Sequence, residues 1–189
     1  MKQERLNLYL IDMKYIRNLH KADDKVSSVS PQIGKQHRIY IGIIVLCNNR
    51  KYLIPLSHAV AKHMKMKPRA DFDKIFDRKG KLIGVLNYNL MIPVEEAQIY
   101  KVNLKPDSDD SASERHYKQL CIDELTWCRK NQEIIVNKAN CLYHLCHGES
   151  GYKGKVRCLD FAKLEQICDK YNRRMDSSRT QQDKSGGWE

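Results

Sequence analysis

Apolar residues in the first half of the chain come in short runs, which is the pattern of β-strands. The runs are rich in β-branched and aliphatic residues and are bounded by Gly, Pro, Asn or Asp, which favour turns. Strands are therefore predicted at residues 6–12, 38–47, 51–56, 81–87 and 91–96. The second and third runs are joined by Asn48 and Asn49, so these two strands are expected to form an antiparallel hairpin.

In the second half, apolar residues recur every three or four positions, as they do along an amphipathic helix. This pattern covers residues 113–130, and Ser111 with Glu114 forms the S-x-x-E capping box that marks a helix start. Further helices are predicted at 131–147 and 159–174. One or two helical turns are also expected within residues 15–24.

These elements predict an α+β fold with a single domain at residues 1–175. Short antiparallel strands tend to curl, so we expect a compact antiparallel β-barrel of five to seven strands, with helices attached mainly from the C-terminal half. The segment 176–189 has almost no apolar content and is expected to be a disordered tail.

The net charge of the chain limits the classes of partner that it is expected to bind. There are 34 Lys and Arg residues against 23 Asp and Glu, which gives a formal net charge of +11. Such a field attracts nucleic acid phosphates or acidic lipid surfaces. The longest apolar run, residues 39–47, is too short for a bilayer, which needs about 20 residues. The N-terminus has no signal-peptide pattern, so a cytoplasmic protein without a membrane partner is expected.

Neither a metal site nor a cofactor site stands out. The seven cysteines are odd in number and include no CxxC pair. A zinc cluster can be drawn from Cys141, Cys146, His147 and Cys158, but its spacing fits no zinc template, and buried structural cysteine is the better interpretation. The glycines form no phosphate-binding fingerprint. We expect neither metal nor cofactor.

The stretch after the strand at 51–56 contains the most side chains that could take part in catalysis. The strand is expected to end at residue 56, so that the polar residues after it lie on a loop. Metal-free RNA cleavage needs a base, an acid and cations around the phosphorus, and this segment supplies them in Ser57, His58, Lys62 and His63. Three more cations follow it: Lys65, Lys67 and Arg69.

Less specific interpretations of the same residues stay open. A charged loop with two histidines is often only a solvated surface, and phosphate binding without catalysis would need only the cations. His37 and Arg38 add positive charge at the entry to the preceding strand, or simply cap it. Tyrosines can stack RNA bases or pack in the core. The candidates are Tyr15, Tyr40 and Tyr117.

The order of several segments resembles the ToxN/AbiQ family of type III toxin–antitoxin endoribonucleases, especially its CptN-like members. The matching pieces are YIRNLHKADDKV at 15–26, RIYIGIIV at 38–45, KYLIPLS at 51–57, GKLIGVLNYNLMIPV at 80–94 and YKQL at 117–120. No piece is diagnostic alone, but their common order makes chance similarity a poor explanation. The C-terminal third matches only as a helical pattern.

The resemblance implies a fold similar to the MazF/Kid toxins and metal-independent cleavage of A-rich RNA to a 2′,3′-cyclic phosphate. It also implies inhibition by a small repeated antitoxin RNA, which the toxin processes and then holds in a closed protein–RNA assembly. Cellular or phage RNA would be the substrate, and such systems serve in phage defence or plasmid maintenance.

The residues that form the site in the family match this chain only in part. After the Pro-Leu that ends the strand, many relatives have Thr or Ser, then Ser, Pro and Lys. Here Ser57 retains the first hydroxyl, His58 replaces the second, and the lysine is missing at Val60, although Lys62 is close enough to replace it. The position of the site is therefore better supported than the assignment of acid and base.

Outside this stretch, Arg38 keeps the basic residue that relatives carry before the central strand, whereas a loop tyrosine of some relatives falls on Gly34. The predicted reaction centre is Ser57, His58, Lys62 and His63. The residues predicted to bind RNA are Arg38, Tyr40, Lys65, Lys67, Arg69, Tyr117 and Lys118. Two alternatives are a non-catalytic RNA-binding module and a MazF-like toxin restrained by a protein antitoxin.

Overall fold

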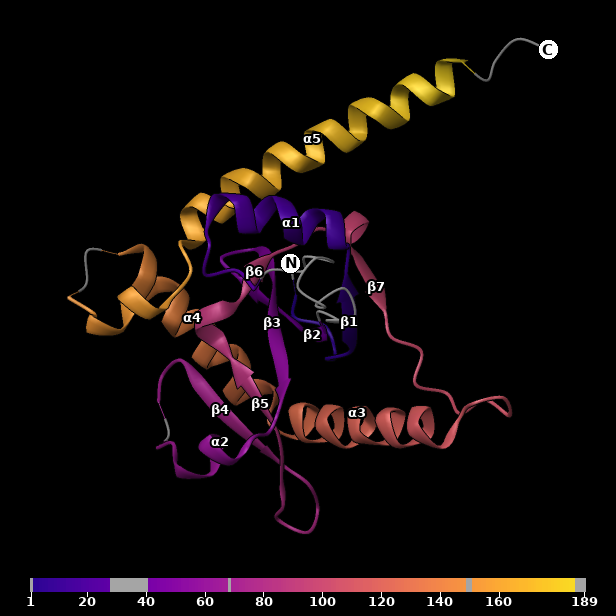
Figure 1. Cartoon of the computed structure of the whole chain (residues 1–189). Helices are drawn as coiled ribbons and strands as arrows, with labels where there is room; N and C mark the ends of the chain where they lie inside the picture. The colour runs from indigo at the N-terminus through magenta and orange to yellow at the C-terminus, as the bar shows by residue number, and fades with distance from the viewer. Residues whose placement is uncertain (1, 28–40, 68, 149–150, 186–189) are drawn as a thin grey trace.

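The computed structural model describes residues 2–27, 41–67, 69–148 and 151–185, with only the backbone described for 176–185. Arg38 and Tyr40, which were predicted to bind RNA, lie outside the described residues. The fold is α+β, with one antiparallel sheet and several helices (Figure 1).

All five predicted strands are present: β1 (Leu8–Ile11), β2 (Ile41–Cys47), β3 (Arg50–His58), β5 (Leu82–Asn87) and β6 (Ile92–Pro93). The predicted hairpin is confirmed, since β2 and β3 pair from Gly42↔Pro55 to Cys47↔Arg50. Asn48 and Asn49 both have positive φ, at 49° and 61°, which suits the tight turn between twisted strands.

Two strands were not predicted, β4 (Phe72–Phe76) and β7 (Ile99–Lys101). The seven-stranded sheet has the order β4-β5-β3-β2-β1-β7, with β6 paired to β3 beside this path. Among the residues that the structure describes, the sheet is not closed, because β4 and β7 lie at the two ends of the strand order without pairing. The predicted barrel is therefore not found there.

The helices are α1 (Met13–Ala22), α2 (Ala61–Lys65), α3 (Ala112–Lys130), α4 (Gln132–His147) and α5 (Phe161–Ser185). The capping box at the start of α3 is confirmed: Ser111 Oγ accepts from the Glu114 N–H at 3.2 Å, and Glu114 Oε2 accepts from the Ser111 N–H at 2.8 Å. The last helix continues through Ser185, beyond the predicted end at 174 and into the tail that was expected to be disordered.

One continuous core joins the sheet to the helices. Its buried side chains include Leu19 of α1, Val45 of β2, Ile54 of β3, Leu142 of α4 and Leu164 of α5. In Figure 1, α1 and α5 lie together on one side of the strands, and α3 lies at the far end from them. This arrangement leaves the C-terminal end of β3 between α2 and α3.

All seven cysteines are free, and only Cys141 is exposed. Among the residues the structure describes, no group of three or more His, Cys, Asp or Glu side chains is placed to hold a metal ion, so the alternative zinc cluster is not formed there. Within the same residues, no helix combines the length and apolarity that crossing a membrane requires.

Candidate functional site

The end of β3 carries the first two residues of the predicted reaction centre. Ser57 pairs with Val85 of β5, and His58 pairs with Gly84. The expected loop is therefore wrong at this point, because β3 continues through His58 instead of ending at Leu56. The strand extends because β5, 26 residues or more further along the chain, supplies backbone partners that the local sequence does not reveal.

Lys62, His63 and Lys65 belong to the short helix α2, where a loop was also expected. Lys62 and Lys65 are exposed, as are Lys67 and Arg69 after the helix. The predicted cations therefore face solvent, where they can meet a polyanion.

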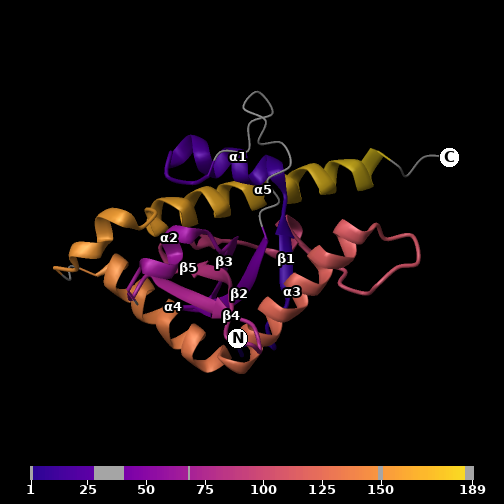
Figure 2. The same ribbon diagram turned by 60° about the horizontal axis from the view of Figure 1, so that its bottom comes forward.

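Successive side chains of a strand point to opposite faces of the sheet. Ser57 and His58 thus leave β3 in opposite directions. Figure 2 shows α2 on one side of the strands and α3 with α4 on the other. The four predicted catalytic residues are divided between these two sides.

Ser57 lies on the α2 side with Asn87 of β5. The side-chain amide of Asn87 donates to Ser57 Oγ at 3.2 Å. Asn87 in turn pairs with Phe72 of β4, whose ring lies 5.8 Å from the His63 ring. This chain of neighbours places α2 above the same face of the sheet as Ser57.

His63 is a buried residue of this side, only 8% exposed. Its Nδ1 accepts the backbone N–H of Val60 at 3.1 Å, which places the proton of the neutral ring on Nε2. Burial, followed by the positive charges of Lys62 and Lys74, lowers the pKa of His63 below its usual value. His63 is thus a neutral imidazole near pH 7 that also fixes the first turn of α2.

His58 lies on the α3 side and is exposed. Its ring centroid is 6.2 Å from that of Tyr117, at an interplanar angle of 80°. Tyr117 is half-buried, and burial raises the pKa of its phenol above its usual value. Tyr117, predicted to bind RNA, is therefore a neutral aromatic neighbour of His58.

A second residue of α3, Glu124, also reaches this face. Its side chain is 2% exposed, and its carboxyl lies against the backbone of Gly84, directly across from His58. Burial, with a smaller contribution from Asp123, raises the pKa of Glu124 to about 8. Sequence reasoning missed both Glu124 and Asn87, because only the strand pairing brings them to the end of β3.

The predicted RNA contact Lys118 and the candidate stacking residue Tyr15 are already engaged within the protein. Lys118 Nζ donates to Asp110 Oδ1 at 2.6 Å and Oδ2 at 2.7 Å. Tyr15 is fully buried, and its hydroxyl donates to the Pro93 carbonyl at 2.7 Å. Tyr15 is thus core packing and cannot stack a base, whereas Lys118 would have to leave Asp110 to meet a phosphate.

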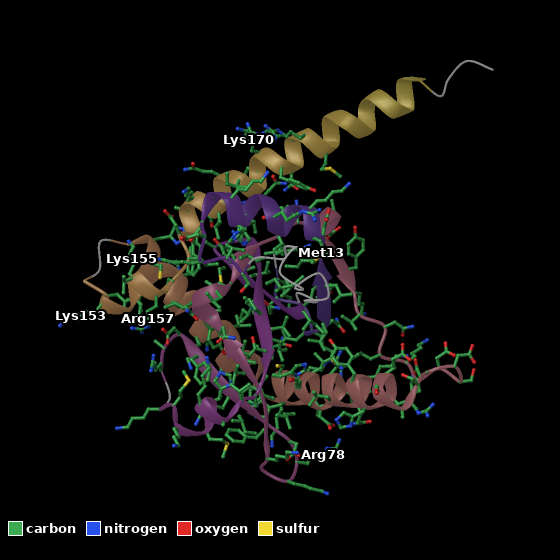
Figure 3. All side chains as sticks on the ribbon, viewed as in Figure 1. Met13, Arg78, Lys153, Lys155, Arg157 and Lys170 are labelled. Carbon is green, nitrogen blue, oxygen red and sulfur yellow. The ribbon has the colours of Figure 1, made fainter. Side chains whose placement is uncertain are left out.

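A further group of cations adjoins the loop after α2. The 3-10 helix Lys153–Arg157 is joined to this loop because Arg157 Nε and Nη2 both lie 2.9 Å from Asp71 Oδ2. Figure 3 shows Lys153, Lys155 and Arg157 projecting from this segment. We call the exposed cations of the two segments the basic surface: Lys65, Lys67, Arg69, Lys153, Lys155 and Arg157.

A separate hollow of about 680 Å³ opens over the sheet near the N-terminus. Apolar residues such as Tyr9, Ile44 and Leu46 line it together with Lys51 and Lys101. Lys51 stands at the opposite end of β3 from Ser57, roughly 20 Å away at 3.3 Å per residue. The hollow is therefore distinct from the predicted reaction centre.

Comparison with known proteins matches residues 7–169 to the family model for toxin ToxN of type III toxin–antitoxin systems. Endoribonuclease ToxN from Bacillus thuringiensis subsp. kurstaki is 30% identical over 172 residues, which cover 88% of this chain and 84% of that protein.

Solved structures agree with these matches. One comes from work on bacterial type III toxin–antitoxin systems with selective toxin inhibition by a non-coding RNA pseudoknot. It has a TM-score of 0.73 and 28% identity, and the alignment covers 89% of this chain and 99% of that one. The lactococcal anti-phage endoribonuclease AbiQ shares the fold, with a TM-score of 0.75 at 21% identity over 90% of this chain and 99% of its own.

Proposed function

The chain belongs to the ToxN family of type III toxin–antitoxin toxins, and from that premise we propose that it is an endoribonuclease toxin restrained by an RNA. The observation that supports this proposal most directly is the end of β3, where Ser57, whose hydroxyl accepts from Asn87, is followed by the exposed His58 and then by the exposed cations of α2.

We propose cleavage by attack of a 2′-hydroxyl, without a metal. The O2′–P bond forms and the P–O5′ bond breaks, which yields a 2′,3′-cyclic phosphate and a 5′-hydroxyl. The proton lost by the 2′-hydroxyl is balanced by the proton gained by O5′, and His58 transfers it, since the residue is exposed and imidazole gives or takes protons near neutrality. Ser57 donates to a phosphate oxygen, and Lys62 offsets the charge that builds on phosphorus.

The two faces of β3 restrict where the phosphate lies. A phosphodiester that meets both Ser57 and His58 must lie along the edge of β3 that is not paired with β5. On that edge, the described part of β2 pairs with β3 only as far as Pro55, so no described strand covers Ser57 or His58 there. His63 is buried, and its ring accepts the backbone N–H of Val60. In this proposal it does not contact the RNA but helps to position Lys62 on α2.

The proposed partners follow from the family and the charge. The basic surface would bind backbone phosphates of a small repeated antitoxin RNA, which the toxin processes from a precursor and keeps in a closed protein–RNA assembly. Cellular or phage RNA, cut at A-rich sites, would be the substrate in phage defence. We also infer a cytoplasmic location and a sheet related to that of the MazF/Kid toxins.

The experiment is expression of the protein with and without its RNA antitoxin. Wild-type protein alone is expected to arrest growth, whereas Ser57→Ala and His58→Ala proteins are expected not to. The matched controls are Ser113→Ala and His144→Ala, exposed residues on α3 and α4. Arrest by both site variants at the wild-type level would refute the site. Copurification of a polypeptide instead of RNA would favour a protein antitoxin, and RNA binding without cleavage would favour a non-catalytic module.

A further inference from the structure

Lys74 of β4 is a cation that the proposed reaction does not use, although it lies on the side of the sheet that carries Ser57. Ser57 pairs with Val85 of β5, and Val85 pairs in turn with Lys74. Directly opposed residues of antiparallel strands share one face of the sheet. Ser57 and Lys74 therefore project to the same side, two strands apart, with roughly 10 Å between their backbones.

The side chain of Lys74 ends at the helix α2. Its Nζ donates to the backbone carbonyl of Met64 at 2.9 Å. Met64 lies in the last turn of this helix, where backbone carbonyls have no hydrogen-bond partner within the helix. Lys74 therefore joins the C-terminal end of α2 to the strand β4.

The N-terminal end of α2 is held by His63, whose Nδ1 accepts the backbone N–H of Val60 at 3.1 Å. Only a ring nitrogen without a proton can accept, so this bond requires the neutral imidazole. After burial, the charges of Lys62 on the same helix and of Lys74 on β4 lower the pKa of His63. The remaining lysine of α2, Lys65, is exposed. Lys74 thus supports one end of α2 by a hydrogen bond and the other by its charge.

The helix α2 needs such support from the sheet. It has five residues, and a helix of that length is not stable in water by itself. It also has no acidic residue in its first turn, so its own lysines repel one another. The contacts described between it and β4 are the bond of Lys74 to Met64 and the packing of the His63 ring near that of Phe72.

We propose that Lys74 is a positioning residue for α2, whose ammonium group holds this helix, and with it Lys62, on the face of the sheet that presents Ser57. Without Lys74, the last turn of α2 loses a partner. His63 then also takes up a proton at a higher pH, and its bond to Val60 is lost. The importance of this for cleavage rests on the proposed function, but the attachment of α2 itself does not.

The first test uses amide hydrogen exchange of the protein without RNA. The Met66 N–H, bonded to the His63 carbonyl at the end of α2, reports on opening of the helix. Its exchange should be about fivefold faster or more in Lys74→Gln, as for the loss of one hydrogen bond. Lys74→Arg keeps both the charge and a donor and should exchange like wild type. The matched control is Lys79→Gln, at an exposed lysine between β4 and β5.

A pH titration of the His63 ring by NMR gives a second readout that a purely structural role would not move. The signal is assigned by its loss in His63→Gln. Its midpoint should rise by about a quarter of a pH unit or more in Lys74→Gln and stay unchanged in Lys74→Arg and Lys79→Gln. In cleavage assays, kcat of Lys74→Gln should fall about fivefold, and Lys74→Arg should restore it.

Wild-type exchange at Met66 together with an unchanged His63 midpoint in Lys74→Gln would overturn the proposal, as would equal changes in Lys79→Gln. Should Lys74→Gln fail to fold, Lys74→Met serves, since it keeps an unbranched apolar stem and lacks the charge and the donor. A wild-type protein that does not cleave RNA, with α2 loosened in Lys74→Gln, would refute the nuclease and keep the positioning role. A wild type that cleaves, with neither change in Lys74→Gln, would do the reverse.

Discussion

The proposed chemistry at the end of β3 rests on single residues. Ser57 and His58 could be singled out from the sequence as candidates because they follow an apolar strand in a cation-rich stretch. Their environment could not, since Asn87 is 30 positions from Ser57 and Glu124 is 66 positions from His58. Such partners depend on strand register and helix packing, which a local pattern does not contain.

The contact between Asn87 and Ser57 predicts coupled effects on cleavage. Asn87→Ala should lower kcat by about tenfold, the equivalent of one hydrogen bond near 1.4 kcal/mol. The double variant Ser57→Ala/Asn87→Ala should be no slower than Ser57→Ala alone, because Asn87 acts through the serine. Single-turnover kinetics measure both values, with Asn137→Ala, an exposed asparagine of α4, as the control. Additive losses would show that Asn87 has a separate role.

Glu124 predicts how stability depends on pH. Its pKa is raised in the folded protein to about 8, from 4.5, so folding favours the protonated form and loses stability as pH rises between these values. The loss is at most on the order of 5 kcal/mol, at about 1.4 kcal/mol per pKa unit. Glu124→Gln should therefore gain stability relative to wild type between pH 4.5 and pH 8.

Urea unfolding at several pH values measures this difference. The gain of Glu124→Gln over wild type should increase with pH through that window, whereas Glu133→Gln should follow wild type. A constant difference across the range would mean that Glu124 is ionised at all of these pH values, or that its environment is accessible to water.

At the scale of elements, the apolar pattern predicted five strands, the hairpin turn and the start of α3, because each is encoded by neighbours in the chain. It missed β4 and β7 and placed a loop where β3 continues. β4 interrupts its apolar residues with Asp73 and Lys74, and β7 has three residues, so neither gives a clear period of two. Long-range pairing with β5 forms the end of β3 that carries the proposed site.

The junction of the 3-10 helix Lys153–Arg157 with the loop after α2 gives a prediction at this scale. Asp71 is 3% exposed, and Arg157 is its ion-pair partner. Arg157→Ala should lower the free energy of unfolding by about 2 kcal/mol, below the usual cost of breaking a buried pair because the arginine is half-exposed. Lys155→Ala should leave stability unchanged, as Lys155 is exposed.

Both variants should weaken RNA binding in a salt-dependent way, since each removes a cation from the basic surface. Thermal unfolding and filter binding at several salt concentrations separate the two effects. Equal stability of the Arg157→Ala and Lys155→Ala proteins would mean that the pair with Asp71 does not hold the segment in place.

At the scale of the whole molecule, the amino-acid composition was a better guide to the class of partner than the hydrophobic pattern was to the architecture of the sheet. A net charge of +11 favours a polyanion whatever the fold, and the family match supports RNA as that polyanion. The predicted barrel was not found among the described residues, because closure depends on whether the two edge strands meet, and nothing in the hydrophobic pattern reports on that.

The most direct test of the account is the chemistry of the RNA ends made by purified protein in excess chelator. Wild type should cut an A-rich RNA and leave 2′,3′-cyclic phosphate and 5′-hydroxyl ends, and His58→Ala should be slower by at least about a hundredfold, as for loss of a general acid–base. Cleavage that stops with chelator, or a His58→Ala protein as fast as wild type, would contradict it.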